Sequence, residues 1–122
     1  MFEISDEDFQ KLIDEALASL KTEHAENIKN VAILFADVPT EEQRVKLKLL
    51  PYQSLFGLYE GTPLTARQGH TPLYPDRITI FKLPMLASVQ NLDELKEQIR
   101  HTLWHEIAHY YGLNHDKIHE LE

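Results

Sequence analysis

The sequence predicts an α/β or α+β domain built around a small sheet. Three observations support this prediction: an amphipathic helix near the N-terminus, three short runs of strand-forming residues, and a long helical pattern near the C-terminus. The order helix, strand, strand, strand, helix, helix fits either fold class. With 122 residues and 43% hydrophobic content, residues 1–122 are expected to form one domain with one ordinary core.

The first helix is expected over residues 6–24. Ser5, followed three residues later by Asp8, resembles a capping box with Asp in place of the usual Glu or Gln. Apolar residues then recur at helical spacing and predict one buried face, made of Phe9, Leu12, Ile13, Ala16, Leu17 and Leu20.

The first strand is expected at residues 31–35. The run is entirely apolar and is followed by Asp37-Val38-Pro39, so we expect a buried strand that ends there. Residues 40–50 are rich in charge and are expected to hold no more than a helical turn or two.

Two further strands flank a long loop at residues 62–75. In the strand at 55–61, Gly57 and Gly61 indicate a bulge or a close approach of two backbones. Residues 77–81 alternate polar and apolar, which is typical of a half-exposed strand. If this strand lies at a sheet edge, its unpaired backbone groups could hold an extended peptide.

The longest helix is expected over residues 92–111. Asn91 and Glu94 form a capping box, and Gly112 is placed as a C-cap. The predicted core stripe consists of Leu92, Leu95, Ile99, Leu103, Ile107 and Tyr110, with Trp104 as a further core residue. A last short helix is expected to begin near Asp116.

Composition narrows the classes of function. The formal net charge is −8, so phosphate backbones and anionic lipid surfaces would repel the chain, and we expect neither nucleic acid nor membrane as a partner. The chain contains no Cys, so a metal must be held by His, Asp or Glu. No signal peptide or apolar membrane-spanning run is recognisable, and a cytoplasmic protein is the expectation.

The segment HEIAHYYGLNH carries the strongest chemical signal. His105 and His109 are four residues apart, so both rings project from one face of the helix toward a single ion. Imidazole is a good zinc ligand, and catalytic zinc sites combine three protein ligands with a water. Glu106 points about 100° around the helix axis and can reach that water as a general base.

A third ligand is needed, and two His residues compete for that role, with Glu120 as a remoter candidate. Gly112 can turn the chain back at the end of the helix, which would bring His115 toward the ion. His119 lies farther along, on the last expected helix, and is the rival candidate. His101 extends the row of His residues by one turn, but an exposed position, or one beside the ligands without contact to the ion, explains it more simply.

Other residues give weaker signals. Hydrogen-bond donors to a developing oxyanion are available from five side chains, for which core packing or a surface role is the simpler interpretation: Tyr59, Tyr74, Tyr110, Tyr111 and Arg77.

The motif HExxHxxGxxH resembles the zinc signature of metzincin metallopeptidases. Together with the stretches GLYEGTPLT and PDRITIFK, it is similar to a family of small bacterial zincin-like metallopeptidase domains. The resemblance implies an α+β minimal zincin fold, in which a small mixed sheet packs on the N-terminal and active-site helices. It also implies zinc as cofactor, His105 and His109 as ligands, and Glu106 as general base.

The predicted function is therefore zinc-dependent hydrolysis of peptide bonds in a peptide or protein substrate. A catalytically silent zinc-binding scaffold or regulatory module is the alternative, although metal binding alone does not require Glu106. A hydrolase of another amide or an ester by the same chemistry is a third hypothesis.

Overall fold

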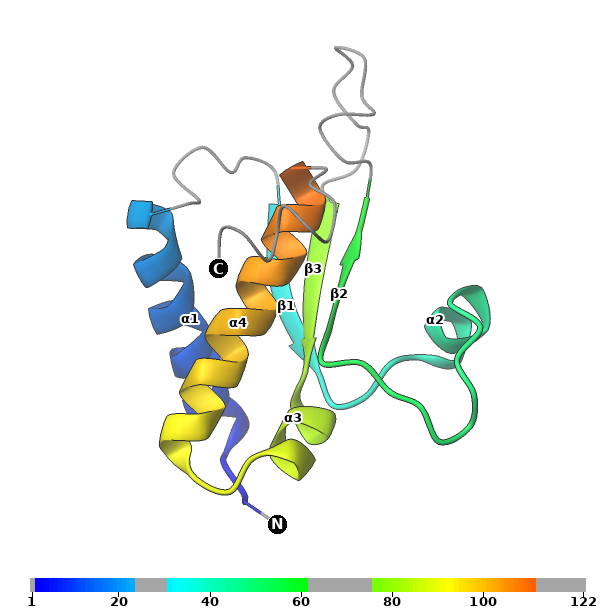
Figure 1. Ribbon diagram of the computed structural model, residues 1–122, viewed down its shortest axis with the longest axis horizontal. Coiled ribbons are helices and arrows are strands. Elements are labelled where there is room, and N and C mark those ends of the chain that lie inside the picture. The colour runs from blue at the N-terminus through cyan, green and yellow to red at the C-terminus, as the bar shows by residue number, and fades with distance from the viewer. Residues whose placement is uncertain (1, 24–30, 62–75, 112–122) are drawn as a thin grey trace.

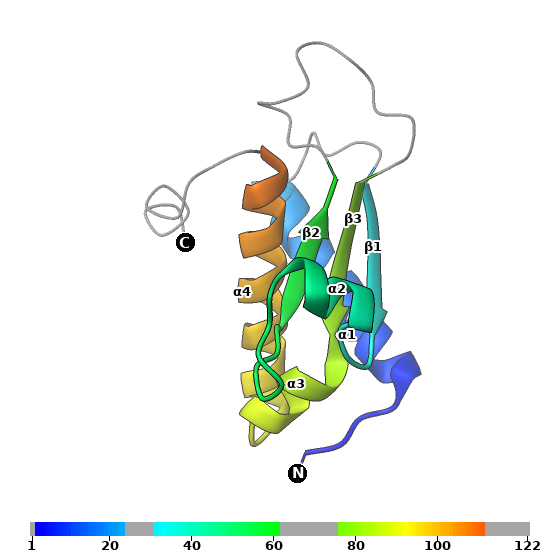
Figure 2. The ribbon, with the colours of Figure 1, turned by 90° about the vertical axis from the view of Figure 1, so that its right-hand side faces the viewer.

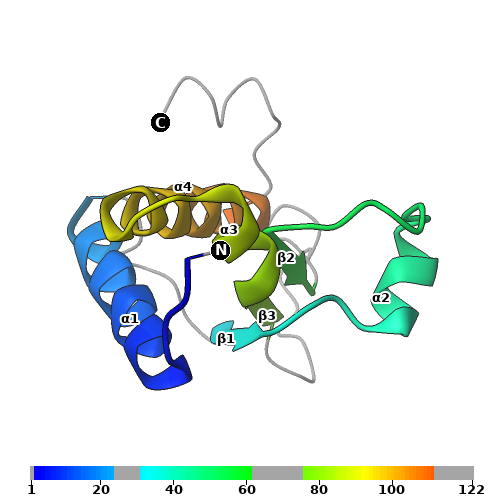
Figure 3. The same cartoon turned by 90° about the horizontal axis from the view of Figure 1, so that it is seen from below.

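The computed structural model describes residues 2–23, 31–61 and 76–111. Helices α1 (Asp6–Glu23) and α4 (Leu92–Tyr111) lie on one face of a three-stranded sheet, as Figures 1 and 3 show. Both helices and all three strands were expected. The α+β class, with a small mixed sheet packed on the first and last of these helices, is confirmed.

The sheet has the strand order β1-β3-β2. The edge strand β1 (Val31–Ala36) runs parallel to β3 (Asp76–Phe81), with Ile33 opposite Ile78. The other edge strand, β2 (Gly57–Glu60), runs antiparallel to β3, with Tyr59 opposite Ile78. The third strand in sequence is therefore the central one.

This topology corrects two predictions. The segment 77–81 was expected to be half exposed and to hold a peptide if it lay at a sheet edge, but β3 is paired on both sides and only Arg77 is exposed. The prediction that it could hold a peptide by strand addition is therefore wrong. Strand β1 differs from its prediction in the other direction. It was expected to be buried, but none of its residues is fully buried, and Leu34 is 46% exposed.

The core lies between the sheet and the two long helices. Ile78 and Ile80 of β3 face the helices and are fully buried. The predicted stripe of α4 is buried from Leu95 to Tyr110, and Trp104 is buried beside it. Leu92 is the exception, at 42% exposed, because it lies in the first turn of the helix.

Side chains cap the starts of both long helices as predicted. Ser5 Oγ accepts a hydrogen bond from the Asp8 backbone N–H at 3.1 Å. Asn91 Oδ1 accepts one from the Glu94 N–H at 2.9 Å, and the Glu94 carboxylate accepts the N–H of Gln90. Donors that lack a partner within the helix are thereby satisfied.

Helix α3 (Lys82–Ser88) was not predicted from the sequence. It contains Pro84, which suggests a loop, yet Pro is tolerated in a first turn because N–H groups there have no partner within the helix. Met85 and Leu86 are buried and attach α3 to the core.

Helix α2 (Glu41–Lys46) stands away from the sheet and the other helices (Figure 1), and none of its residues is buried. It occupies part of the 40–50 segment, where a turn or two of helix was expected. Thr40 and Gln43 form a reciprocal capping box at its start.

Several predictions concern residues outside the described ranges: the 62–75 loop, Gly112 as a C-cap, and the last helix from Asp116. Among the described helices, none is long and apolar enough to cross a membrane.

Candidate metal centre

The final turns of α4 bring together three of the residues singled out in the sequence. Each of His105, Glu106 and His109 offers one ligand atom, and these atoms all lie within 4.8 Å of one another. The two imidazole rings are tilted by 57°, with centroids 4.7 Å apart. The i, i+4 spacing on a regular helix produces this proximity, as predicted.

The three side chains differ in exposure. Both His residues are partly exposed, whereas Glu106 is only 6% exposed. Burial raises the pKa of Glu106 from 4.5 to about 7, although a hydrogen bond from the Tyr59 backbone N–H lowers it in part. His109 Nδ1 lies 3.5 Å from Glu106 Oε1, so the buried carboxylate borders the imidazole pair.

Strand β2 covers Glu106 from the sheet side; Figure 2 shows β2 running beside α4. The Tyr59 N–H donates to Glu106 Oε1 at 2.9 Å. A Cβ atom at Gly57 would lie 2.6 Å from Thr102 Cγ2 and 3.4 Å from Glu106 Cγ. The close approach that Gly57 indicated in the sequence is therefore confirmed, and its partner is α4.

A second polar contact lies next to this one. The Tyr59 hydroxyl donates to Asp76 Oδ2 at 2.6 Å, and Asp76 is 1% exposed. The Tyr59 ring also meets Tyr110 edge to face, with centroids 6.2 Å apart. At Gly61 φ is +155°, and an added Cβ would overlap the Asp76 carboxylate. Gly61 thus allows a second close approach.

Sequence reasoning missed Asp76 and the backbone N–H of Tyr59. Asp76 precedes the apolar run of its strand and matches no catalytic motif, and a main-chain donor leaves no signature in residue types. The available signal was the pair of glycines that flank Leu58-Tyr59-Glu60, which marked a tight backbone approach without naming the partner.

The remaining candidates fall into two groups. His101 is exposed, as predicted, and Arg77 forms an ion pair with Glu60 on the sheet face away from the helices. His115, His119 and Tyr74 lie outside the described residues, as does the side chain of Tyr111.

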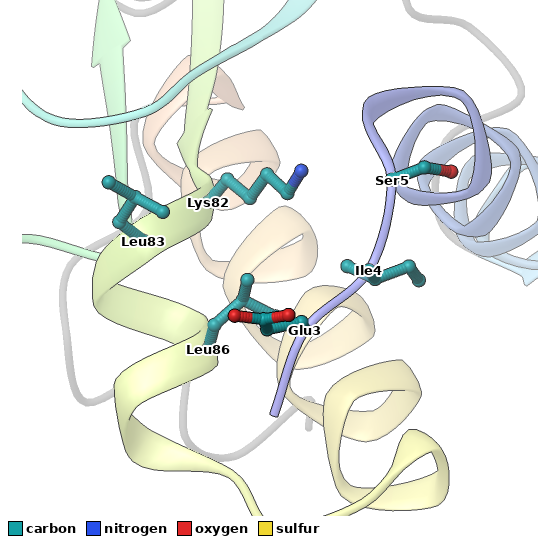
Figure 4. Close-up of a pocket in the computed structure, with 6 residues that line it drawn as sticks. All are labelled: Glu3, Ile4, Ser5, Lys82, Leu83 and Leu86. Atoms are coloured by element: carbon teal, nitrogen blue, oxygen red, sulfur yellow. The ribbon is translucent and has the colours of Figure 1, made fainter. Parts of the chain in front are cut away.

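A cavity of about 490 Å³ lies at the other end of the molecule, between the N-terminal segment and α3 (Figure 4). Its charged groups include Lys82, whose Nζ already bonds Asp6 Oδ1 at 2.7 Å, and Glu3. None of the described residues that line this cavity is a His, whereas α4 carries two His residues beside a carboxylate. The cluster on α4 is therefore the stronger candidate for a functional site.

The donors at the end of α4 fit a zinc ion. Two imidazoles four residues apart can bind zinc through ring nitrogens, and the adjacent carboxylate supplies a proton acceptor. No Cys is present in the chain, so a thiolate site is excluded.

Comparison with known proteins agrees with this chemistry. The family model described as zincin-like metallopeptidase matches residues 28–122, which include β1, β2, β3, α2, α3 and the whole of α4. No curated protein matches the sequence. Because the match covers well over half of the chain, the protein belongs to the zincin-like metallopeptidase family.

Proposed function

We propose that the protein is a zinc-dependent peptidase in which Glu106 acts as general base. The observation that carries the proposal is the position of Glu106: this buried carboxylate lies beside two imidazoles and accepts a hydrogen bond from the Tyr59 N–H at 2.9 Å. A carboxylate held in place beside a metal-binding group can accept a proton from water and return it in the next step.

His105 and His109 would hold the ion, with His115 as the third ligand and His119 as the alternative. Zinc bound there would supply Lewis acidity toward the substrate carbonyl and would lower the pKa of the attacking water. Within the chain, Tyr59 N–H and His109 both approach Glu106 Oε1. We therefore assign Oε2 as the oxygen that takes the proton from water and passes it to the leaving amine.

The burial of Glu106 favours catalysis over a silent zinc-binding module. Keeping a carboxylate in an apolar site costs free energy, as its raised pKa reflects. A protein that only binds zinc through His residues gains nothing from that cost, whereas a peptidase uses the carboxylate as its general base.

Glu106→Gln separates the two possibilities. Gln has almost the same shape but cannot accept the proton, so we expect zinc content to be unchanged and peptide hydrolysis to fall by about 10²–10⁴-fold. Activity in a peptide-library cleavage assay and metal content by mass spectrometry are the two measurements. Equal activity in the two proteins would remove Glu106 from the mechanism.

A second pair of variants tests the ligands. His105→Ala with His109→Ala is expected to abolish zinc binding, whereas His101→Ala, an exposed His one turn earlier on the same helix, should leave it intact. An unchanged zinc stoichiometry in the double variant would contradict the proposed site.

A further inference from the structure

Strand β2 is short, and it supplies the backbone contact to Glu106. It has four residues, begins with Gly57, is followed by Gly61 and pairs with β3 on one side. Phe81 N–H bonds Phe56 O, and paired positions alternate along an antiparallel ladder, so the Tyr59 N–H points away from β3. That outward N–H is the one that holds Glu106.

Three contacts of Tyr59 connect this strand to the rest of the site. Its amide bonds Glu106, its ring packs on Tyr110 one turn later on α4, and its hydroxyl bonds Asp76 on β3. In the register, Tyr59 lies opposite Ile78, so Asp76 is its diagonal neighbour on the same face. Diagonal neighbours lie within reach of an aromatic side chain.

The bond to Asp76 is well suited to fix the strand. An O–H donor to a carboxylate makes a short, charge-assisted hydrogen bond, and this one measures 2.6 Å. Asp76 is almost fully buried, so water competes little for its oxygen. The hydroxyl therefore anchors the β2 backbone at the residue that contacts Glu106.

We propose that Tyr59 is a positioning residue for Glu106: the bond from its hydroxyl to Asp76 holds the β2 backbone, and the Tyr59 N–H then fixes the Glu106 carboxylate. This inference rests on the proposed role of Glu106 as general base. Orientation matters because a catalytic group must be held close to its productive geometry for rapid proton transfer.

The test compares variants of the full-length protein. Tyr59→Phe removes only the hydroxyl and keeps both the amide and the ring contact with Tyr110. Asp76→Ala removes the acceptor, whereas Asp76→Asn keeps an acceptor oxygen and removes the charge. Arg77→Gln is the matched control, because it removes a polar pair between the same two strands on the opposite face.

We expect Tyr59→Phe and Asp76→Ala each to lower kcat about tenfold, with KM changed by less than about twofold and zinc content unchanged. The double variant should be no slower than either single variant, because the same bond is lost. Asp76→Asn should retain most of the activity, and Arg77→Gln all of it. A wild-type kcat in Tyr59→Phe, or additive losses in the double variant, would overturn the proposal.

A measurement on the metal-free protein separates this inference from the proposed function. The amide proton of residue 59 should exchange with solvent about tenfold faster in Tyr59→Phe, beyond any change at Ile80 in the central strand. An unchanged exchange rate would refute the anchoring role even if Glu106→Gln is inactive. Conversely, faster exchange in a protein without peptidase activity would uphold the anchor and refute the proposed function.

Discussion

Strands β2 and β3 are joined by a polar side-chain pair on each face of the sheet, and the two pairs differ in burial. On the helix face, the Tyr59 hydroxyl meets an Asp76 that is 1% exposed. On the other face, Glu60 and Arg77 lie 3.5 Å apart, and the Arg77 side chain is 56% exposed. A hydrogen bond and an ion pair, which join the same two strands on opposite faces, therefore differ strongly in exposure to solvent.

This difference in burial determines how firmly each pair can fix the geometry of the two strands. Exposed ion pairs contribute about 0–1 kcal/mol and constrain geometry little. A charge-assisted bond to a buried carboxylate is stronger, because water has little access to the acceptor. The helix face of this sheet can therefore hold a polar side chain in place, and it is on this face that Tyr59 and Gly57 meet Glu106 of α4.

Truncating an apolar side chain on each face gives the largest expected contrast. Ile78→Ala on the helix face, where Ile78 is fully buried, should lower the free energy of unfolding by about 2–5 kcal/mol. Leu34→Ala on the other face should cost less than about 1.5 kcal/mol, because nearly half of that side chain is already in water. Denaturant unfolding measures both changes. Similar losses would contradict the difference in burial between Ile78 and Leu34.

The pH dependence of stability tests the environment of Glu106. Its pKa is raised from 4.5 to about 7, so the folded protein binds this proton more tightly than the unfolded chain does. Its contribution to stability is therefore fully present below pH 4.5 and is lost as the pH rises through about 7. In the metal-free protein, wild type should lose about 3 kcal/mol more than Glu106→Gln across this window. Parallel stability curves for the two proteins would contradict the burial of a titrating Glu106.

Adding one methyl group at Gly57, on the helix face, should lower the free energy of unfolding by a smaller amount. A second substitution, at Thr102, should restore part of it. In Gly57→Ala the new Cβ would lie 2.6 Å from Thr102 Cγ2, so β2 must shift, at a cost of about 1–3 kcal/mol. Thr102→Ser removes that Cγ2 and keeps the hydroxyl that accepts a hydrogen bond from Gln98.

The double variant Gly57→Ala with Thr102→Ser should regain much of the lost stability, and Thr102→Ser alone is the control. Thermal unfolding of the four proteins forms a double-mutant cycle. An additive result would mean that β2 and α4 are not in close contact at Gly57.

The sequence alone determined the helical parts of the site. The stripe from Leu95 to Tyr110 predicted which face of α4 is buried, and the spacing of His105 and His109 predicted that their rings meet. Caps at Ser5 and Asn91 were also predicted correctly. These features depend on residues three or four positions apart, and helix geometry fixes how such residues face one another.

Only the tertiary structure decided the order of the strands and what surrounds Glu106. The apolar run at β1 became a partly exposed edge, and the alternating segment at β3 became the buried centre. The bond from Tyr59 to Glu106 joins residues 47 positions apart, and that from Tyr59 to Asp76 spans 17. A strand's burial and partners depend on which strands and helices pack beside it, and the residues of one segment do not encode its distant neighbours.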